Sequence, residues 1–166
     1  MRRRHTPSAT TAAAVALIVA LVPACGGDDG GGGDGGGGDV GSADGSVAIT
    51  LKEFAVAAEP ASVPAGSVTF DVTNEGPDDV HEFVVIATDL GPTELPVDDD
   101  GAVLEAGEGM KVVDEIEDIP VGDAPTLTVD LTAGNYVLIC NILQEEPDGS
   151  LEAHYSVGMR SGFTVE

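Results

Sequence analysis

The sequence of 166 residues carries 30 Asp and Glu residues against only 6 Lys and Arg residues, and its formal net charge is −24 at pH 7. Three of the basic residues are Arg2, Arg3 and Arg4, so the rest of the chain sets three basic side chains against all 30 acidic ones, for a net charge of −27. A surface this acidic repels phosphate groups, which excludes nucleic acid as a partner and favours a partner with a basic surface.

Residues 1–24 have the organisation of a secretory signal peptide. The three arginines precede an uncharged apolar run from Ala12 to Val22, which is too short for a comfortable membrane span. The segment Val22-Pro23-Ala24-Cys25 resembles a bacterial lipobox, which implies cleavage before Cys25 and lipidation of its thiol. The alternatives are ordinary cleavage after Ala24 and an uncleaved anchor. We therefore expect an exported protein, anchored by a lipid on Cys25 to the extracytoplasmic side of the cell membrane.

Residues 25–46 are expected to form a disordered tether. From Gly26 to Ser46 the chain is almost entirely Gly, Asp, Ser and Ala, and it cannot bury enough apolar surface to offset the entropy of ordering. A Gly-rich coil of this length spans about 25 Å on average. The Asp-Gly repeats lack the spacing of an EF-hand calcium loop, so a solvated linker is the better interpretation.

Residues 47–166 are long enough for one domain. Helical periodicity is almost absent, and alternation is clean at 67–73, where Val68, Phe70 and Val72 share one face. The expected strands are 47–51 (continued by 54–57), 67–73, 80–88, 110–116, 127–131, 136–140 and 162–166, with a long acidic loop at 90–109. Seven or eight short strands between turns predict an all-β fold, either a two-sheet sandwich or a barrel.

Beyond Cys25 the chain has a single cysteine, Cys140, at the end of an apolar strand. An exported protein would offer this thiol no disulfide partner if Cys25 is lipidated. A lone thiol in an oxidising compartment is reactive unless it is buried or bound to a metal. The pattern therefore leaves two readings open, a metal ligand and a buried, inert cysteine.

Two histidines and a methionine complete a possible ligand set around Cys140. His81 lies at the entry of an apolar strand, and His154 and Met159 lie between an acidic loop and the last strand. Two imidazoles, a thiolate and a weak axial thioether are the ligands of a type 1 copper site, so the set predicts one bound copper ion. Each residue also has an ordinary alternative, because a lone strand histidine is usually structural and Met159 could fill the core beside Phe163.

The order of these residues resembles the cupredoxin family of the plastocyanin and azurin type. The resemblance covers residues 47–166 and rests on His81 within 74–83, Cys140 within 136–141, and the segment 154–159, with four residues between His154 and Met159. It implies a Greek-key β-sandwich, one type 1 copper ion and electron transfer. It also implies that the edge of His154 passes the electron, and that Asn141 braces the two ligand loops through hydrogen bonds.

One departure from the family is the 13-residue acidic segment from Asn141 to Ala153, since the corresponding segment of the small blue proteins is short. A long loop costs little in closure entropy, so ligation stays possible. The departure leaves open how exposed His154 is and whether the acidic loop docks a partner.

Three functions fit these observations. The leading hypothesis is a membrane-tethered, monomeric electron carrier rather than an enzyme, because four protein ligands leave copper no open position for a substrate. The second is a surface lipoprotein that buffers or delivers copper, although a chain with only Met110 and Met159 after the signal is poor in the ligands that such proteins use. The third is a metal-free β-sandwich of the cell envelope, in which the four residues would not converge.

Overall fold

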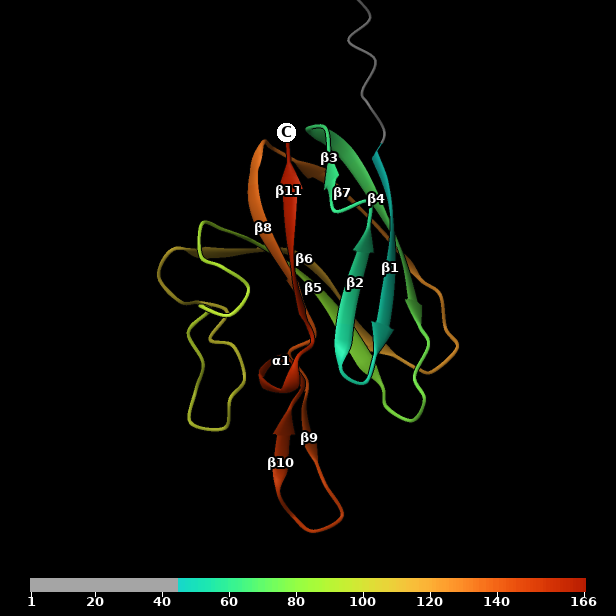
Figure 1. Ribbon diagram of the computed structural model, residues 1–166, viewed down its shortest axis with the longest axis vertical. Coiled ribbons are helices and arrows are strands. Elements are labelled where there is room, and N and C mark those ends of the chain that lie inside the picture. The colour runs from blue at the N-terminus through green and yellow to red at the C-terminus, as the bar shows by residue number, and fades with distance from the viewer. Residues whose placement is uncertain (1–44) are drawn as a thin grey trace, which may run out of the picture. The chain divides into compact units, whose positions relative to one another are not determined.

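The computed structural model describes residues 45–166 (Figure 1). The predicted signal peptide, Cys25 and the tether up to residue 44 lie outside the described residues. The first strand begins at Gly45, so the folded domain includes two residues that the sequence placed in the tether. No helix in the range 45–166 is long and apolar enough to cross a membrane.

Eleven strands and one short helix make up the described domain. Eight strands have five residues or more, as expected: β1 (Gly45–Lys52), β2 (Ala55–Glu59), β4 (Gly66–Asn74), β5 (His81–Thr88), β6 (Met110–Ile119), β7 (Thr126–Leu131), β8 (Gly134–Ile139) and β11 (Arg160–Val165). Four short elements were not predicted, namely β3 (Ser62–Val63), β9 (Leu143–Glu145), β10 (Leu151–Ala153) and helix α1 (His154–Val157). Segments of two to four residues are too short to show a period.

The long strands form the two sheets of a β-sandwich, which confirms the predicted fold class. One sheet has the order β2-β1-β4-β7 and the other the order β3-β11-β8-β5-β6. Neighbouring strands are antiparallel except for the pairs β1–β4 and β3–β11. The core lies between the sheets, where the ring of Phe70 packs 5.3 Å from that of Phe83 and 5.5 Å from that of Phe163.

Strand β5 is buried on both faces, which explains its continuous apolar sequence. Phe83 and Val85 belong to the core between the sheets, whereas Val84 and Ile86 pack in a second cluster on the outer face. The long loop between β5 and β6 and helix α1 cover that outer face with three buried side chains, Leu95, Val103 and Tyr155. The acidic loop 90–109 is therefore a cover for the sheet as well as a connection.

The acidic segment between Cys140 and His154 folds into a β-hairpin. Strands β9 and β10 pair in antiparallel register, with Leu143 opposite Ala153 and Glu145 opposite Leu151. The hairpin extends from helix α1 away from the two sheets (Figure 1). The strand pairing at its base keeps the two ends of the insertion adjacent.

Candidate metal centre

The structure brings His81, Cys140 and His154 together at one end of the sandwich. The Nδ1 atoms of the two histidines are 3.2 Å apart, and the Cys140 Sγ atom lies 3.4 Å from Nδ1 of His154 and 3.9 Å from Nδ1 of His81. All three side chains have no exposed surface. Within residues 45–166 they are the one group of His, Cys, Asp and Glu side chains close enough to share a metal ion.

The three donor atoms have the spacing that a single metal ion requires. A point equidistant from them lies about 2.0 Å from each, close to the metal–nitrogen distance of about 2.0–2.1 Å and the metal–thiolate distance of about 2.3 Å in zinc proteins. The distal Nε2 atoms of both histidines are buried without a hydrogen-bond partner. With both Nδ1 atoms turned inward and the cysteine sulfur beside them, the residues fit a soft or borderline metal ion.

Three different parts of the fold deliver the donors. His81 is the first residue of β5, and a register shift between His81 and Phe83 turns its side chain at the end of the sheet. Cys140 directly follows β8, and its N–H donates to the carbonyl of Met159 over 3.1 Å. His154 begins α1, and its carbonyl accepts the N–H of Met159 over 2.9 Å.

Helix α1 ends at Val157, and the residue that follows it, Gly158, has to be glycine. Its φ of +139° is a conformation that other residues rarely adopt, and a Cβ atom there would lie 2.8 Å from the carbonyl oxygen of Phe54. The turn at Gly158 carries Met159 back to Cys140. Met159 is fully buried, and the hydrogen bonds of its main chain to Cys140 and His154 place it beside these two donors.

Burial keeps the metal-binding groups in their uncharged forms when no metal is bound. It lowers the pKa of His154, and burial together with the charge of the neighbouring His154 lowers the pKa of His81. Burial also raises the pKa of the Cys140 thiol to about 12, although the Glu82 N–H donates to its sulfur over 3.4 Å. The histidines are therefore ready to bind at neutral pH, whereas the thiol has to release a proton.

Asn141 connects the two ligand loops through its main-chain N–H, whereas its side chain bonds to the covering loop. Its N–H donates to the Glu82 carboxylate over 2.7 Å, which ties Cys140 to the residue after His81. Its side chain accepts the Val103 N–H over 2.6 Å and donates to the Val103 carbonyl and the Glu105 carboxylate. Asn141 thus holds the covering loop 90–109 against the centre. Burial raises the pKa of the Glu82 carboxyl to about 7.

Sequence reasoning missed Asn74, which braces the loop before His81. Its fully buried amide donates to the carbonyls of Asp79 (2.8 Å) and Ile119 (2.9 Å), and its Oδ1 atom accepts the Gly76 N–H over 2.8 Å. Asn74 lies in the Asn-Glu-Gly-Pro segment, whose turn chemistry predicts a loop. The sequence predicts only a turn at this position, because nothing in it shows that the amide spans three segments.

His154 has no exposed edge. Phe54 packs against it with the ring centroids 5.4 Å apart in an edge-on arrangement, and the two imidazole rings contact each other at 5.1 Å. The insertion fixes the main chain of His154, because the Ile142 carbonyl accepts the His154 N–H over 2.9 Å. The exposed histidine edge implied by the family resemblance is therefore absent, and the sequence had left this point open.

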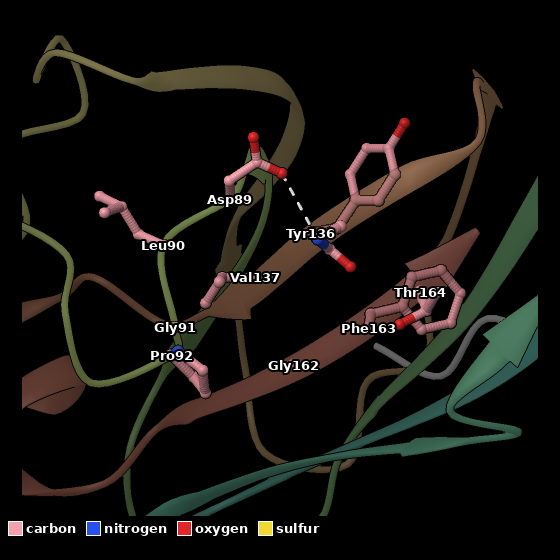
Figure 2. Close-up of a pocket in the computed structure, with 10 residues that line it drawn as sticks. Asp89, Leu90, Gly91, Pro92, Tyr136, Val137, Gly162, Phe163 and Thr164 are labelled. Carbon is pink, nitrogen blue, oxygen red and sulfur yellow. Dashed lines mark hydrogen bonds between the residues drawn. The ribbon is translucent and has the colours of Figure 1, made fainter. Parts of the chain in front are cut away.

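A separate hollow of about 240 Å³ lies against β8 and β11, where the covering loop begins (Figure 2). Asp89, Pro92, Tyr136 and Phe163 are among its lining residues, and Asn135 donates to the Asp89 carboxylate over 3.4 Å. No lining residue is a candidate metal ligand. The chemistry of the described domain is concentrated at the His–Cys–His centre.

Comparison with solved structures finds proteins of the same fold. Reduced rusticyanin is 21% identical, with a TM-score of 0.50 over 73% of this chain and 78% of its own. Rusticyanin from Thiobacillus ferrooxidans is 18% identical, with a TM-score of 0.50 over 73% and 76%. Reduced auracyanin from Roseiflexus castenholzii is 20% identical over 73% and 96%, with a TM-score of 0.49. No family model and no curated protein matches the sequence. The described domain has the cupredoxin fold that the sequence motifs implied.

Proposed function

We propose that the protein is a type 1 copper protein that carries single electrons. The observation that supports this most directly is the convergence of two Nδ1 atoms and one thiol sulfur within 3.9 Å of one another, fully buried and beside a buried methionine. Copper bound there would cycle between Cu(I) and Cu(II). Rusticyanin, which has a similar fold, is a copper protein.

The residues of this chain would serve that function by holding one geometry in both oxidation states. His81 and His154 would supply the nitrogen ligands, Cys140 the thiolate, and Met159 the weak axial thioether. Hydrogen bonds from the Glu82 N–H to the Cys140 sulfur and from the Cys140 N–H to the Met159 carbonyl limit movement of these ligands. A buried set of four ligands leaves no position for a substrate, so we infer that the protein is not an enzyme.

We further propose that the carrier works as a monomer at the outer face of the cytoplasmic membrane, anchored through a lipid on Cys25. Support for this comes from the lipobox-like segment and from the Gly/Asp-rich stretch that follows it. The redox partner would carry a basic surface, since the chain after the arginines has three basic residues against 30 acidic ones. Metabolic labelling with a radioactive fatty acid tests the anchor, and Cys25→Ser is expected to abolish incorporation.

Copper buffering or delivery is the second candidate, and burial argues against it. Exchangeable sites need access for an incoming acceptor, whereas all four ligand residues here have no exposed surface. In the carrier, a chelator should remove copper slowly. Rapid loss of copper to a chelator would favour delivery.

A spectrum of the purified protein with added Cu(II) tests the carrier proposal. We expect an intense blue thiolate-to-copper absorption band and a narrow copper hyperfine splitting in the electron paramagnetic resonance spectrum. Cys140→Ser is expected to abolish the band, because a serine hydroxyl does not replace the thiolate. A colourless protein, or a blue band that persists in Cys140→Ser, would refute the ligand assignment.

A further inference from the structure

A hollow of about 430 Å³ lies next to the metal centre and is lined mainly by acidic side chains. Its lining residues are Glu53, Phe54, Pro77, Asp78, Asp79, Gln144, Glu146 and Glu152. They come from the turn between β1 and β2, from the loop before His81, and from the β9–β10 hairpin. The hairpin register places Gln144 opposite Glu152, so one face of the hairpin lines the hollow while Leu143 and Leu151 point the other way.

Hydrogen bonds build this hollow in a defined shape. Glu53 Oε1 accepts the N–H groups of Asp79 (2.6 Å) and Asp78 (3.0 Å), and Gln144 donates to the Asp79 carboxylate over 2.9 Å. These bonds fix the positions of the Glu53 and Asp79 carboxylates at the wall of the hollow.

The hollow has negative charge without a cation to balance it. The other oxygen of Glu53, Oε2, is buried and has no hydrogen-bond partner. Of the three basic residues in the range 45–166, Lys52 pairs with Glu75 at 2.7 Å and Arg160 stacks on Tyr155, while Lys111 lies on β6. None of them forms an ion pair with a carboxylate of the hollow. An incoming cation would thus meet carboxylates that no lysine or arginine of residues 45–166 neutralises.

One lining side chain separates the hollow from each histidine, Glu53 on the side of His81 and Phe54 on the side of His154. The buried Nε2 atom of His81 has no hydrogen-bond partner and points to Glu53 Oε1 at 3.9 Å. On the other side, Phe54 lines the hollow and packs against the ring of His154. A group seated in the hollow would be separated from the metal ligands by a single side chain, a short path for an electron.

These observations point to a side-chain cation as the occupant. Within residues 45–166, no three acidic groups of the hollow bring their oxygens close enough together to share a metal ion, since the one such group is the His–Cys–His centre. A volume of about 430 Å³ admits an ammonium or guanidinium group on its alkyl chain. Such a group can pair with carboxylates that are spread around a cavity.

We propose that this hollow is the docking site for a lysine or arginine side chain of the redox partner, which it seats over Phe54, one side chain away from the two ligand histidines. The inference rests on the proposed carrier function. It replaces the exposed histidine edge of the small blue proteins with a charged socket formed in part by the acidic hairpin. The hairpin is then the part of this chain that selects a basic partner.

A basic c-type cytochrome serves as the probe, in the full-length protein at low ionic strength. The double variant Glu146→Gln/Glu152→Gln removes two charges from the hollow, and neither side chain makes a hydrogen bond or ion pair within residues 45–166. The control, Glu145→Gln/Asp99→Asn, removes two exposed charges elsewhere, including one on the opposite face of the same hairpin. We expect the hollow variant to raise the Kd about five- to tenfold and to slow electron transfer similarly, and the control to change both by less than about twofold.

Equal effects in the two double variants would show that only net charge matters, and no effect in either would show that the partner binds elsewhere; both results overturn the proposal. A third outcome is that CaCl₂ slows electron transfer to the cytochrome more than NaCl does at the same ionic strength, in the wild type but not in the hollow variant. That result would assign the hollow to a metal cation and also overturn the proposal. Calorimetry measures the Kd without relying on the blue colour. A protein that stays colourless with Cu(II) would therefore refute the carrier function independently of the result on docking.

Discussion

The main-chain N–H of His154 donates a hydrogen bond of 2.9 Å to the carbonyl oxygen of Ile142. This bond closes the base of the β9–β10 hairpin, where Leu143 also pairs with Ala153. Cys140 and His154 are 14 positions apart in sequence, yet their sulfur and Nδ1 atoms lie 3.4 Å apart. The acidic insertion therefore leaves the ligand geometry intact, because it folds as a separate hairpin whose paired base keeps its two ends together.

The first prediction concerns the removal of that hairpin. Replacing residues 144–152 with Asn-Gly, which favours a two-residue hairpin turn, should preserve the blue absorption band and the copper hyperfine splitting. The contacts that hold His154, to Ile142 and through the Leu143–Ala153 pair, lie outside the deleted segment. Absorption and paramagnetic resonance spectra of the copper-loaded variant provide the measurement.

Gly158→Ala is the informative contrast to the deletion. It adds a single methyl group, but that group would lie 2.8 Å from the Phe54 carbonyl in a backbone conformation that alanine rarely adopts. We expect it to perturb the spectrum more than the loss of nine residues does. Loss of the blue band in the deletion variant with retention in Gly158→Ala would contradict this view of the loop.

The second prediction tests the bracing by Asn74. Asn74→Ala removes three hydrogen bonds from a fully buried site and leaves the Asp79 and Ile119 carbonyls unpaired. We expect it to lower the free energy of unfolding by about 2–4 kcal/mol and to broaden the copper resonance by loosening His81. Denaturant unfolding gives the energy. Asn135→Ala, at an exposed site with one long bond, is the control and should stay within about 0.5 kcal/mol.

The third prediction concerns the axial position. Met159→Leu keeps nearly the same volume in the core, so the fold and the blue colour should persist. Because it removes a donor to copper and leaves the three strong ligands, the potential should rise. A rise of about 60 mV corresponds to a tenfold relative loss of Cu(II) affinity for a one-electron couple. Protein-film voltammetry measures the shift, and an unchanged potential would mean that Met159 is core filler.

The fourth prediction is a dependence of copper affinity on pH. Burial raises the pKa of the Cys140 thiol to about 12, so the metal-free thiol is protonated throughout the neutral range and must lose its proton on binding. Release of one proton makes Cu(II) binding about tenfold tighter for each pH unit between pH 7 and 9. The lowered pKa values of His81 and His154 keep both rings neutral there, so they add nothing to the slope. Competition titrations with a chelator of known affinity measure it, and Cys140→Ser should flatten it.

Much of the architecture could be predicted from local patterns. The strands β4 and β5 could be predicted from the alternation in 67–73 and from the continuous apolar sequence of β5. The reason is that the side-chain period of a strand is two residues and repeats within a short segment. The ligand set could be predicted because the chain after Cys25 contains only two histidines and one cysteine, in an order that resembles that of the cupredoxin family.

What the sequence determined by itself was composition and order: the extreme acidity, an all-β domain, and four candidate ligands of which three converge with the fourth beside them. Tertiary structure alone decided how the insertion closes, which residues brace His81 and Cys140, and that Phe54 and an acidic hollow cover the histidines. The physical reason is that strand patterns and ligand types are local properties, whereas hydrogen bonds between residues 25 to 59 positions apart, such as those from Asp78 to Glu53 and from Asn141 to Glu82, exist only after the chain has folded.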